Sequence, residues 1–104
     1  MRVAIIYRPR SVAPLEVAPM LMGALGQWVE THAERFSTME FFVAGGGLVL
    51  ADFDDSAELQ RIVAENPFTP YMDVEIQPVV EPSVAMATYS QTVAALAGAA
   101  QPAG

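Results

Sequence analysis

Residues 66–80 read NPFTPYMDVEIQPVV, and the rest of the chain is interpreted outward from them. Residues 67–70 begin and end with proline, which disfavours helix in the residue before it, so a preceding helix must stop near Asn66. Residues 73–77 then alternate polar and apolar side chains, which predicts a strand with one wet and one buried face. Pro78 cannot donate a ladder hydrogen bond, so we expect this strand to lie at a sheet edge or to end there.

The beginning of the chain predicts a strand followed by a helix. Residues 3–7 are apolar and rich in β-branched side chains, which is typical of a buried central strand. Residues 15–33 repeat apolar side chains at close to 3.6 residues, and a proline near their start favours Ala18 as the first regular helical position. Gly23 and Gly26 lower helix stability, so they permit either close packing on the sheet or space for a ligand.

The middle of the chain predicts a β-hairpin. Residues 35–44 alternate as a strand does, and residues 48–54 predict a third strand. Between them, residues 45–47 are three glycines, which suit a tight turn with positive φ. A phosphate-binding loop is the alternative, but such loops lead into a helix and carry a lysine, and neither feature follows here.

The second helix has a clear start and end. Asp55 and Glu58 match a capping box, so this helix is expected to run from there to about Glu65. An alanine-rich segment, residues 84–97, predicts a C-terminal helix, and residues 98–104 are expected to fray.

The resulting order strand, helix, strand, strand, helix, strand is the split βαβ pattern of a ferredoxin-like α+β fold with an antiparallel sheet. We expect a ferredoxin-like domain over residues 1–83 and a C-terminal helix with a frayed tail over residues 84–104. Two helices cover only one sheet face, whereas the first three predicted strands have apolar residues on both faces. A homodimer in which two sheets pack face to face would bury the second face.

The second half of the chain resembles the muconolactone isomerase family. The matching residues are Phe53, Asp54, Ser56, Glu58, Leu59, Ile62, Pro67, Pro70, Tyr71, Met72, Glu75, Pro78, Pro82 and Ser83. The resemblance implies a ferredoxin-like monomer that pairs into a dimeric α+β barrel. Three departures favour another substrate: Pro9 follows Arg8, residues 34–42 differ from the family's Trp- and Arg-containing segment, and Glu81 stands where the family usually has His.

Composition excludes several classes of function. Five basic against twelve acidic residues give a formal charge of −7, which argues against nucleic acid and against anionic membrane surfaces. The chain has no cysteine and no visible signal peptide or spanning segment, which fits a cytoplasmic protein. It shows no metal-ligand spacing and no dinucleotide fingerprint, so we expect neither a metal nor a cofactor.

Two residues are candidates for acid–base catalysis. In the alternating pattern Glu40 shares a strand face with Phe36 and Phe42, where desolvation would raise its pKa; alternatively it meets solvent or an arginine at the dimer seam. His32 follows Trp28 by one helical turn and is either a proton shuttle in a pocket or a hydrogen-bonded residue at the helix end.

Five further residues are candidates for substrate binding: Tyr7, Arg8, Trp28, Phe42 and Tyr71. The two phenols would orient a carbonyl or carboxylate, or serve only as packing aromatics. Arg8 would bind a ligand carboxylate or form an ordinary surface ion pair.

These features predict a cofactor-independent isomerase or cyclase that moves a proton on an apolar lactone, enone or polyketide-like substrate, as in natural-product biosynthesis. A non-catalytic binding or interaction module and a cofactor-free oxygenase of the same fold are the alternatives, because fold alone does not select among them.

Overall fold

The computed structural model describes residues 1–100. The elements are β1 (Arg2–Pro9), α1 (Ala18–His32), the 3₁₀ turn η1 (Ala33–Arg35), β2 (Phe36–Phe41), β3 (Gly47–Asp52), α2 (Ser56–Glu65), the 3₁₀ turn η2 (Thr69–Tyr71), β4 (Met72–Pro78) and α3 (Pro82–Ala100). The strands form one antiparallel sheet in the order β2-β3-β1-β4. The predicted ferredoxin-like βαββαβ arrangement is therefore confirmed, with β1 inside the sheet and β4 at its edge.

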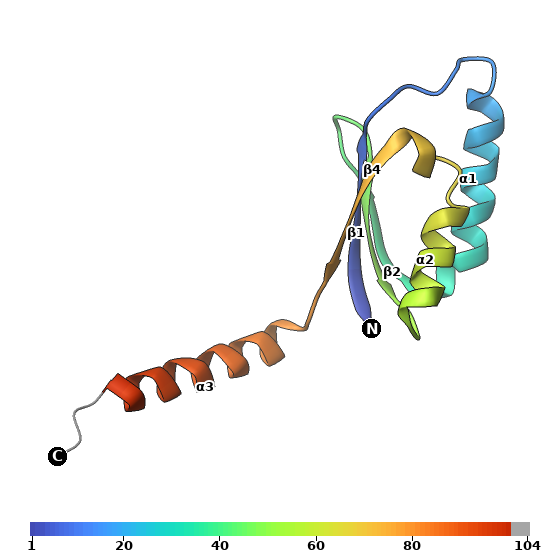
Figure 1. The fold of residues 1–104 in the computed structure, drawn as a ribbon. Helices are drawn as coiled ribbons and strands as arrows, with labels where there is room; N and C mark the ends of the chain where they lie inside the picture. Colours follow the sequence, from blue (N-terminus) through green and yellow to red (C-terminus); the bar gives the residue numbers. More distant parts are fainter. Residues whose placement is uncertain (101–104) are drawn as a thin grey trace.

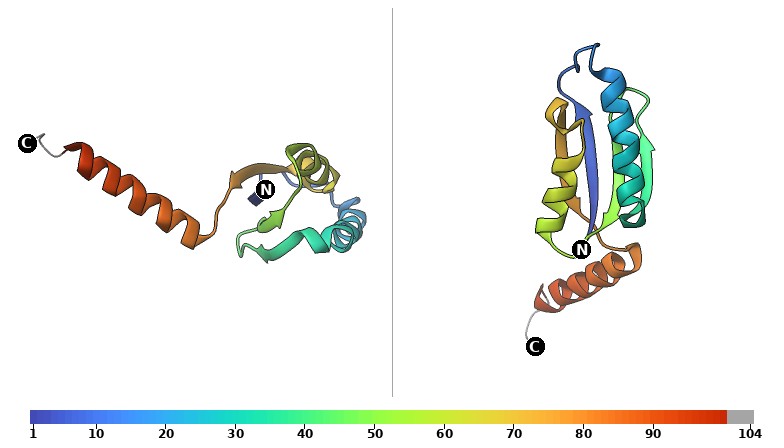
Figure 2. Two further views of the ribbon diagram at one scale, coloured as in Figure 1. Left: turned by 90° about the horizontal axis from the view of Figure 1, so that it is seen from below. Right: turned by 90° about the vertical axis from the view of Figure 1, so that its right-hand side faces the viewer.

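Helices α1 and α2 lie together on one face of the sheet (Figures 1 and 2). The core between them and the strands contains Val3, Ile5, Val49, Phe53 and Ile62, each at most 2% exposed. Burying an aliphatic side chain of this size contributes about 1.5–3 kcal/mol. The indole Nε1 of Trp28 on α1 donates to the Ile62 carbonyl on α2 at 2.9 Å, so one buried hydrogen bond joins the two helices.

A β-bulge in β2 changes which side chains face the helices. Phe36 lies opposite Ala51 while Thr38 lies opposite Leu50, so β2 advances two residues for one on β3. Phe36 therefore faces the helices, where its ring lies 5.1 Å from that of Trp28. The expectation that Glu40 shares a face with Phe36 was wrong, because the bulge breaks the simple alternation between them.

The hairpin between β2 and β3 has the predicted glycine turn. Gly45 and Gly46 have φ values of 103° and 80°, which favour glycine. Phe42 N donates to the Gly46 carbonyl and Gly45 N to the Phe42 carbonyl, both at 3.0 Å. These turn bonds end β2 at Phe41, three residues before the expected end.

No element within residues 1–100 covers the other sheet face, which we call the open face (Figure 1). On β1 and β3 it presents Ala4, Ile6, Leu48 and Leu50, which lie opposite one another in the register. On β2 it presents Thr38 and Glu40, so the expected apolar face is found on β1 and β3 but not on β2.

Local signals around α2 act as predicted. The Asp55 carboxylate accepts a hydrogen bond from Glu58 N at 2.8 Å and caps the helix. The helix ends at Glu65, directly before Asn66 and the proline that follows it. Turn η2 then leads into β4, and its Tyr71 carbonyl accepts from Arg10 N and Ser11 N, which attaches the loop after β1 to this end of the sheet.

Helix α3 begins two residues before the expected start and continues to Ala100, past the predicted end. It projects from the domain and has no buried residue (Figure 1). Residues 101–104 of the predicted frayed tail lie outside the described residues. Within residues 1–100, every helix falls short of the length or hydropathy needed to cross a membrane.

Candidate functional site

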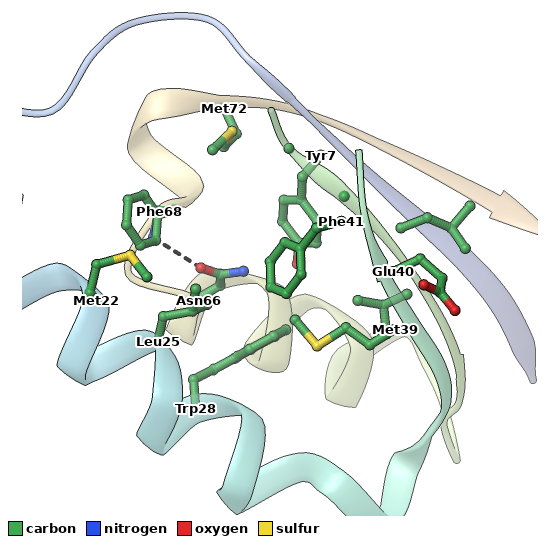
Figure 3. A pocket seen from close by; sticks show the side chains of 14 residues that line it. Tyr7, Met22, Leu25, Trp28, Met39, Glu40, Phe41, Asn66, Phe68 and Met72 are labelled. Carbon is green, nitrogen blue, oxygen red and sulfur yellow. Dashed lines mark hydrogen bonds between the residues drawn. The ribbon is translucent and has the colours of Figure 1, made fainter. Parts of the chain in front are cut away.

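A cavity of about 260 Å³ lies between α1, the sheet and the segment that joins α2 to β4 (Figure 3). Its wall is almost entirely apolar. Side chains from four parts of the fold form most of it: Met22, Leu25, Trp28, Met39, Phe41, Phe68 and Met72. Three polar side chains also border it, those of Tyr7, Glu40 and Asn66. A largely apolar cavity with few polar groups is typical of a small-molecule site.

Tyr7 projects from β1 toward the helices because it continues the alternation of Val3 and Ile5. The side chain is 6% exposed, and its hydroxyl has no hydrogen-bond partner among the described residues. Burial raises the pKa of Tyr7, and the Asn66 side chain offsets this only in part. The phenol therefore stays protonated near neutral pH and is a hydrogen-bond donor rather than a base.

Asn66 is the C-cap of α2 and is 5% exposed. Its Oδ1 accepts a hydrogen bond from Phe68 N at 2.9 Å, which fixes the orientation of the amide. Figure 3 shows the amide nitrogen on the side of Tyr7. From the sequence, Asn66 was recognised only as a helix end; the available signal was a hydrogen-bonding side chain at the point where a proline stops the helix.

His32 lies outside the cavity. It is 9% exposed, and its Nε2 lies 3.0 Å from Glu65 Oε2, while its ring packs edge-on against Trp28. The contact with His32 lowers the pKa of Glu65. In this geometry His32 is a hydrogen-bonded residue at the end of α1, which is the second of the two alternatives given for it. An acid–base role for His32 stays a prediction.

Glu40 borders the cavity, but its side chain belongs to the open face, opposite Leu48. The residue is exposed. Figure 3 shows its carboxylate directed away from Asn66 and Trp28. The desolvated position expected from the sequence is therefore absent in the described chain, and a catalytic role for Glu40 stays a prediction.

The other candidate binding residues divide into two groups. Trp28 lines the cavity together with Tyr7. Arg8 lies on the open side of the sheet, where its Nη1 bonds Glu75 Oε2 at 2.9 Å, as an ordinary ion pair does. This contact lowers the pKa of Glu75. Phe42 and Tyr71 do not line the cavity; Phe42 begins the glycine turn and is 40% exposed, and Tyr71 ends η2.

Residues 1–100 contain no group of three or more histidine, cysteine, aspartate or glutamate side chains arranged to hold a metal ion. The uncharged polar groups that the fold brings together at the cavity are a phenol and an amide. Both donate hydrogen bonds, so the cavity can bind an acceptor oxygen and stabilise negative charge that develops on it.

Comparison with known proteins identifies relatives at the level of family and fold. The family described as "Domain of unknown function (DUF3303)" matches residues 5–93. A structure of 5-chloro-2-hydroxyhydroquinone dehydrochlorinase (TftG) from Burkholderia phenoliruptrix AC1100, in complex with 2,5-dihydroxybenzoquinone, is similar at a TM-score of 0.68 and 12% identity, covering 80% of this chain and 97% of that one. A muconolactone isomerase structure is similar at a TM-score of 0.65 and 18% identity, covering 80% and 93%. No curated protein matches the chain.

Proposed function

Because this chain belongs to the family described as "Domain of unknown function (DUF3303)" and shares the fold of muconolactone isomerase, we propose that it is a cofactor-independent isomerase or cyclase. Its substrate is a small apolar molecule with a carbonyl oxygen, such as a lactone, an enone or a polyketide-like ring. The observation that carries this proposal is the buried, unpartnered hydroxyl of Tyr7 at an apolar cavity.

The proposed chemistry is proton transfer next to the substrate carbonyl. Removal of a proton from a carbon between the carbonyl and a carbon–carbon double bond gives a dienolate, and return of the proton to the far end of that dienolate shifts the double bond. The Tyr7 hydroxyl and the Asn66 amide donate hydrogen bonds to the oxygen on which negative charge develops. Donors placed in this way contribute about 10²–10³-fold each to the rate of such reactions.

Glu40 is the proposed base, because it is the one predicted acid–base residue that borders the cavity. Strand β2 is an edge strand, and the proposal brings the carboxylate to the cavity round that edge. In the described conformation the carboxylate points away, and the proposal therefore requires a change of rotamer when substrate binds.

The two structural relatives support a small ring as the substrate. The dehydrochlorinase structure holds 2,5-dihydroxybenzoquinone, a ring with carbonyl oxygens, and the other relative is named for its action on a lactone. At 12% and 18% identity both relatives establish the fold alone, so the reaction of this chain rests on its own Tyr7 and Asn66.

Hydrogen–deuterium exchange tests the proposal without knowledge of the product. Cyclohex-2-enone and γ-lactones are incubated with the protein in D₂O, and loss of the proton next to the carbonyl is followed by NMR. We expect the wild type to accelerate exchange, Tyr7→Phe to lower the rate about 10²–10³-fold and Glu40→Gln about 10²–10⁴-fold. Tyr89→Phe, on exposed α3, is the matched control and should retain the full rate.

A non-catalytic binding module is the second candidate, and one observation favours it. Of the described residues at the cavity, none directs a carboxylate or imidazole into it. Binding of these compounds without any exchange above buffer would decide for the binding module. Oxygen consumption with quinol or anthrone substrates distinguishes the oxygenase alternative from the isomerase, because an isomerase consumes no oxygen.

We also propose that the protein is a homodimer that buries the open face. Ile6, Leu48 and Leu50 support this, because together they form an apolar strip on an uncovered sheet. Leu50→Asp would place an unpaired carboxylate in that interface. Light scattering should give twice the chain mass for the wild type and the single mass for the variant; a wild-type monomer at micromolar concentration would contradict the dimer.

A further inference from the structure

We propose that the cavity selects uncharged, flat carbonyl compounds and rejects carboxylates. This inference rests on the proposed function, because it names the class of ligand that the same cavity takes. Three features of the chain support it: the placement of its basic side chains, the two uncharged polar groups at the cavity, and the side chains of the cavity wall.

All the basic side chains lie outside the cavity and are paired with acidic ones. The five basic residues of the chain are all arginines, and none of them lines the cavity. Each forms an ion pair with an acid of the same chain: Arg2 with Glu81, Arg8 with Glu75, Arg10 with Asp73, Arg35 with Asp54 and Glu58, and Arg61 with Glu65. A carboxylate in the cavity would therefore meet no counter-charge, and the formal charge of −7 adds repulsion.

The polar groups match a single neutral acceptor. The Tyr7 hydroxyl and the Asn66 amide both come from uncharged side chains and lie on the same side of the cavity (Figure 3). Two donors of this kind satisfy the two lone pairs of one carbonyl oxygen. The second oxygen of a carboxylate would face the apolar wall, and burying an unpaired charge there is strongly unfavourable.

The wall favours a flat ring. Three methionines and three aromatic residues form much of it: Met22, Met39, Met72, Trp28, Phe41 and Phe68. Methionine adapts to irregular shapes and makes favourable sulfur–aromatic contacts, so such a wall fits planar ligands without fixing one outline. Met22 and Phe41 are 59% and 70% exposed, which places the mouth of the cavity between α1 and the end of β2.

Acetophenone and benzoate form a matched pair for the test, because they share a ring and differ mainly in a methyl group or a charged oxygen. The 104-residue chain is titrated with each at pH 7 and followed by ¹H–¹⁵N NMR, where the one tryptophan, Trp28, supplies a single indole resonance at the cavity wall. We expect acetophenone to shift this resonance and to bind at least about tenfold more tightly than benzoate.

Met22→Lys is the second arm of the experiment. The side chain is exposed at the mouth, so the variant should fold, and the new cation should raise the affinity for benzoate relative to that for acetophenone about tenfold. Benzoate binding to the wild type as tightly as acetophenone would overturn the selection and leave the small-molecule function in place. If neither compound perturbs the Trp28 resonance at millimolar concentration, the proposed function fails and the selection fails with it.

Discussion

Replacing Tyr7 by Phe should stabilise the ligand-free protein while it weakens ligand binding. The Tyr7 side chain is 6% exposed, and its hydroxyl has no partner among residues 1–100. A buried polar group without a partner costs about 1–3 kcal/mol, and phenylalanine keeps the ring while it removes that group. Although Asn66 makes no hydrogen bond to this hydroxyl, its side chain is near enough to lower the pKa of Tyr7, so we expect a gain at the low end, about 1 kcal/mol.

Urea unfolding followed by Trp28 fluorescence measures this gain. A stability increase of about 1 kcal/mol corresponds to a rise in Tm of about 4–8 °C for a domain of this size. Acetophenone affinity should fall about 2–10-fold, because one hydrogen bond to the ligand is lost. Tyr89→Phe, on exposed α3, should change stability by less than about 0.5 kcal/mol.

The opposite result would refute the reasoning. If Tyr7→Phe lowers the free energy of unfolding by about 1 kcal/mol or more, the hydroxyl makes a good hydrogen bond in the folded protein. It would then be a structural group, and the cavity would lose the polar side chain on which the proposed function depends.

Four further predictions concern stability. Burial raises the pKa of Tyr7 above 10.0, so the folded state holds the phenol proton more tightly than the unfolded state does. The free energy of unfolding is therefore unaffected by this group below pH 10.0 and falls as pH rises from there through the folded-state pKa. Urea unfolding between pH 8 and 11 should show this fall in the wild type and a smaller one in Tyr7→Phe. Gly26→Ala should raise the free energy of unfolding by about 1 kcal/mol, because a Cβ there meets no atom within 4 Å. Gly46→Ala should lower it by more than about 1 kcal/mol, because φ is +80° and the Cβ would collide with the Tyr7 carbonyl oxygen. Asp55→Ala should cost about 1 kcal/mol through loss of the cap on α2, and thermal unfolding checks these variants together.

The order of the elements could be predicted from the sequence because each boundary has a local chemical cause. The proline after Asn66 ends α2, Asp55 begins it, and the glycines at positions 45 and 46 allow the positive φ of the hairpin turn. Each of these signals acts within a few residues, so tertiary packing does not override it.

The candidate site was only partly predictable because its composition depends on pairing between strands. The bulge between Phe36 and Thr38 moves Glu40 to the open face. No single residue type in β2 predicts this bulge. Tyr7 and Trp28 could be proposed as aromatic residues of a pocket, and the structure places both at the cavity. Asn66 was missed as a cavity residue because ending a helix already explains an asparagine at this position.

Helix α3 has a consequence for the thermodynamics of the chain. Its nineteen residues include no charged side chain and none that is buried. An isolated helix of about this length is only marginally stable in water, and α3 lacks the charged pairs four residues apart that support such helices. The helix–coil equilibrium of residues 82–100 is therefore coupled to whatever covers their apolar side chains. The helical signal per residue in far-ultraviolet circular dichroism would then increase with protein concentration if the chain assembles through α3. It would stay constant if the chain assembles through the sheet alone.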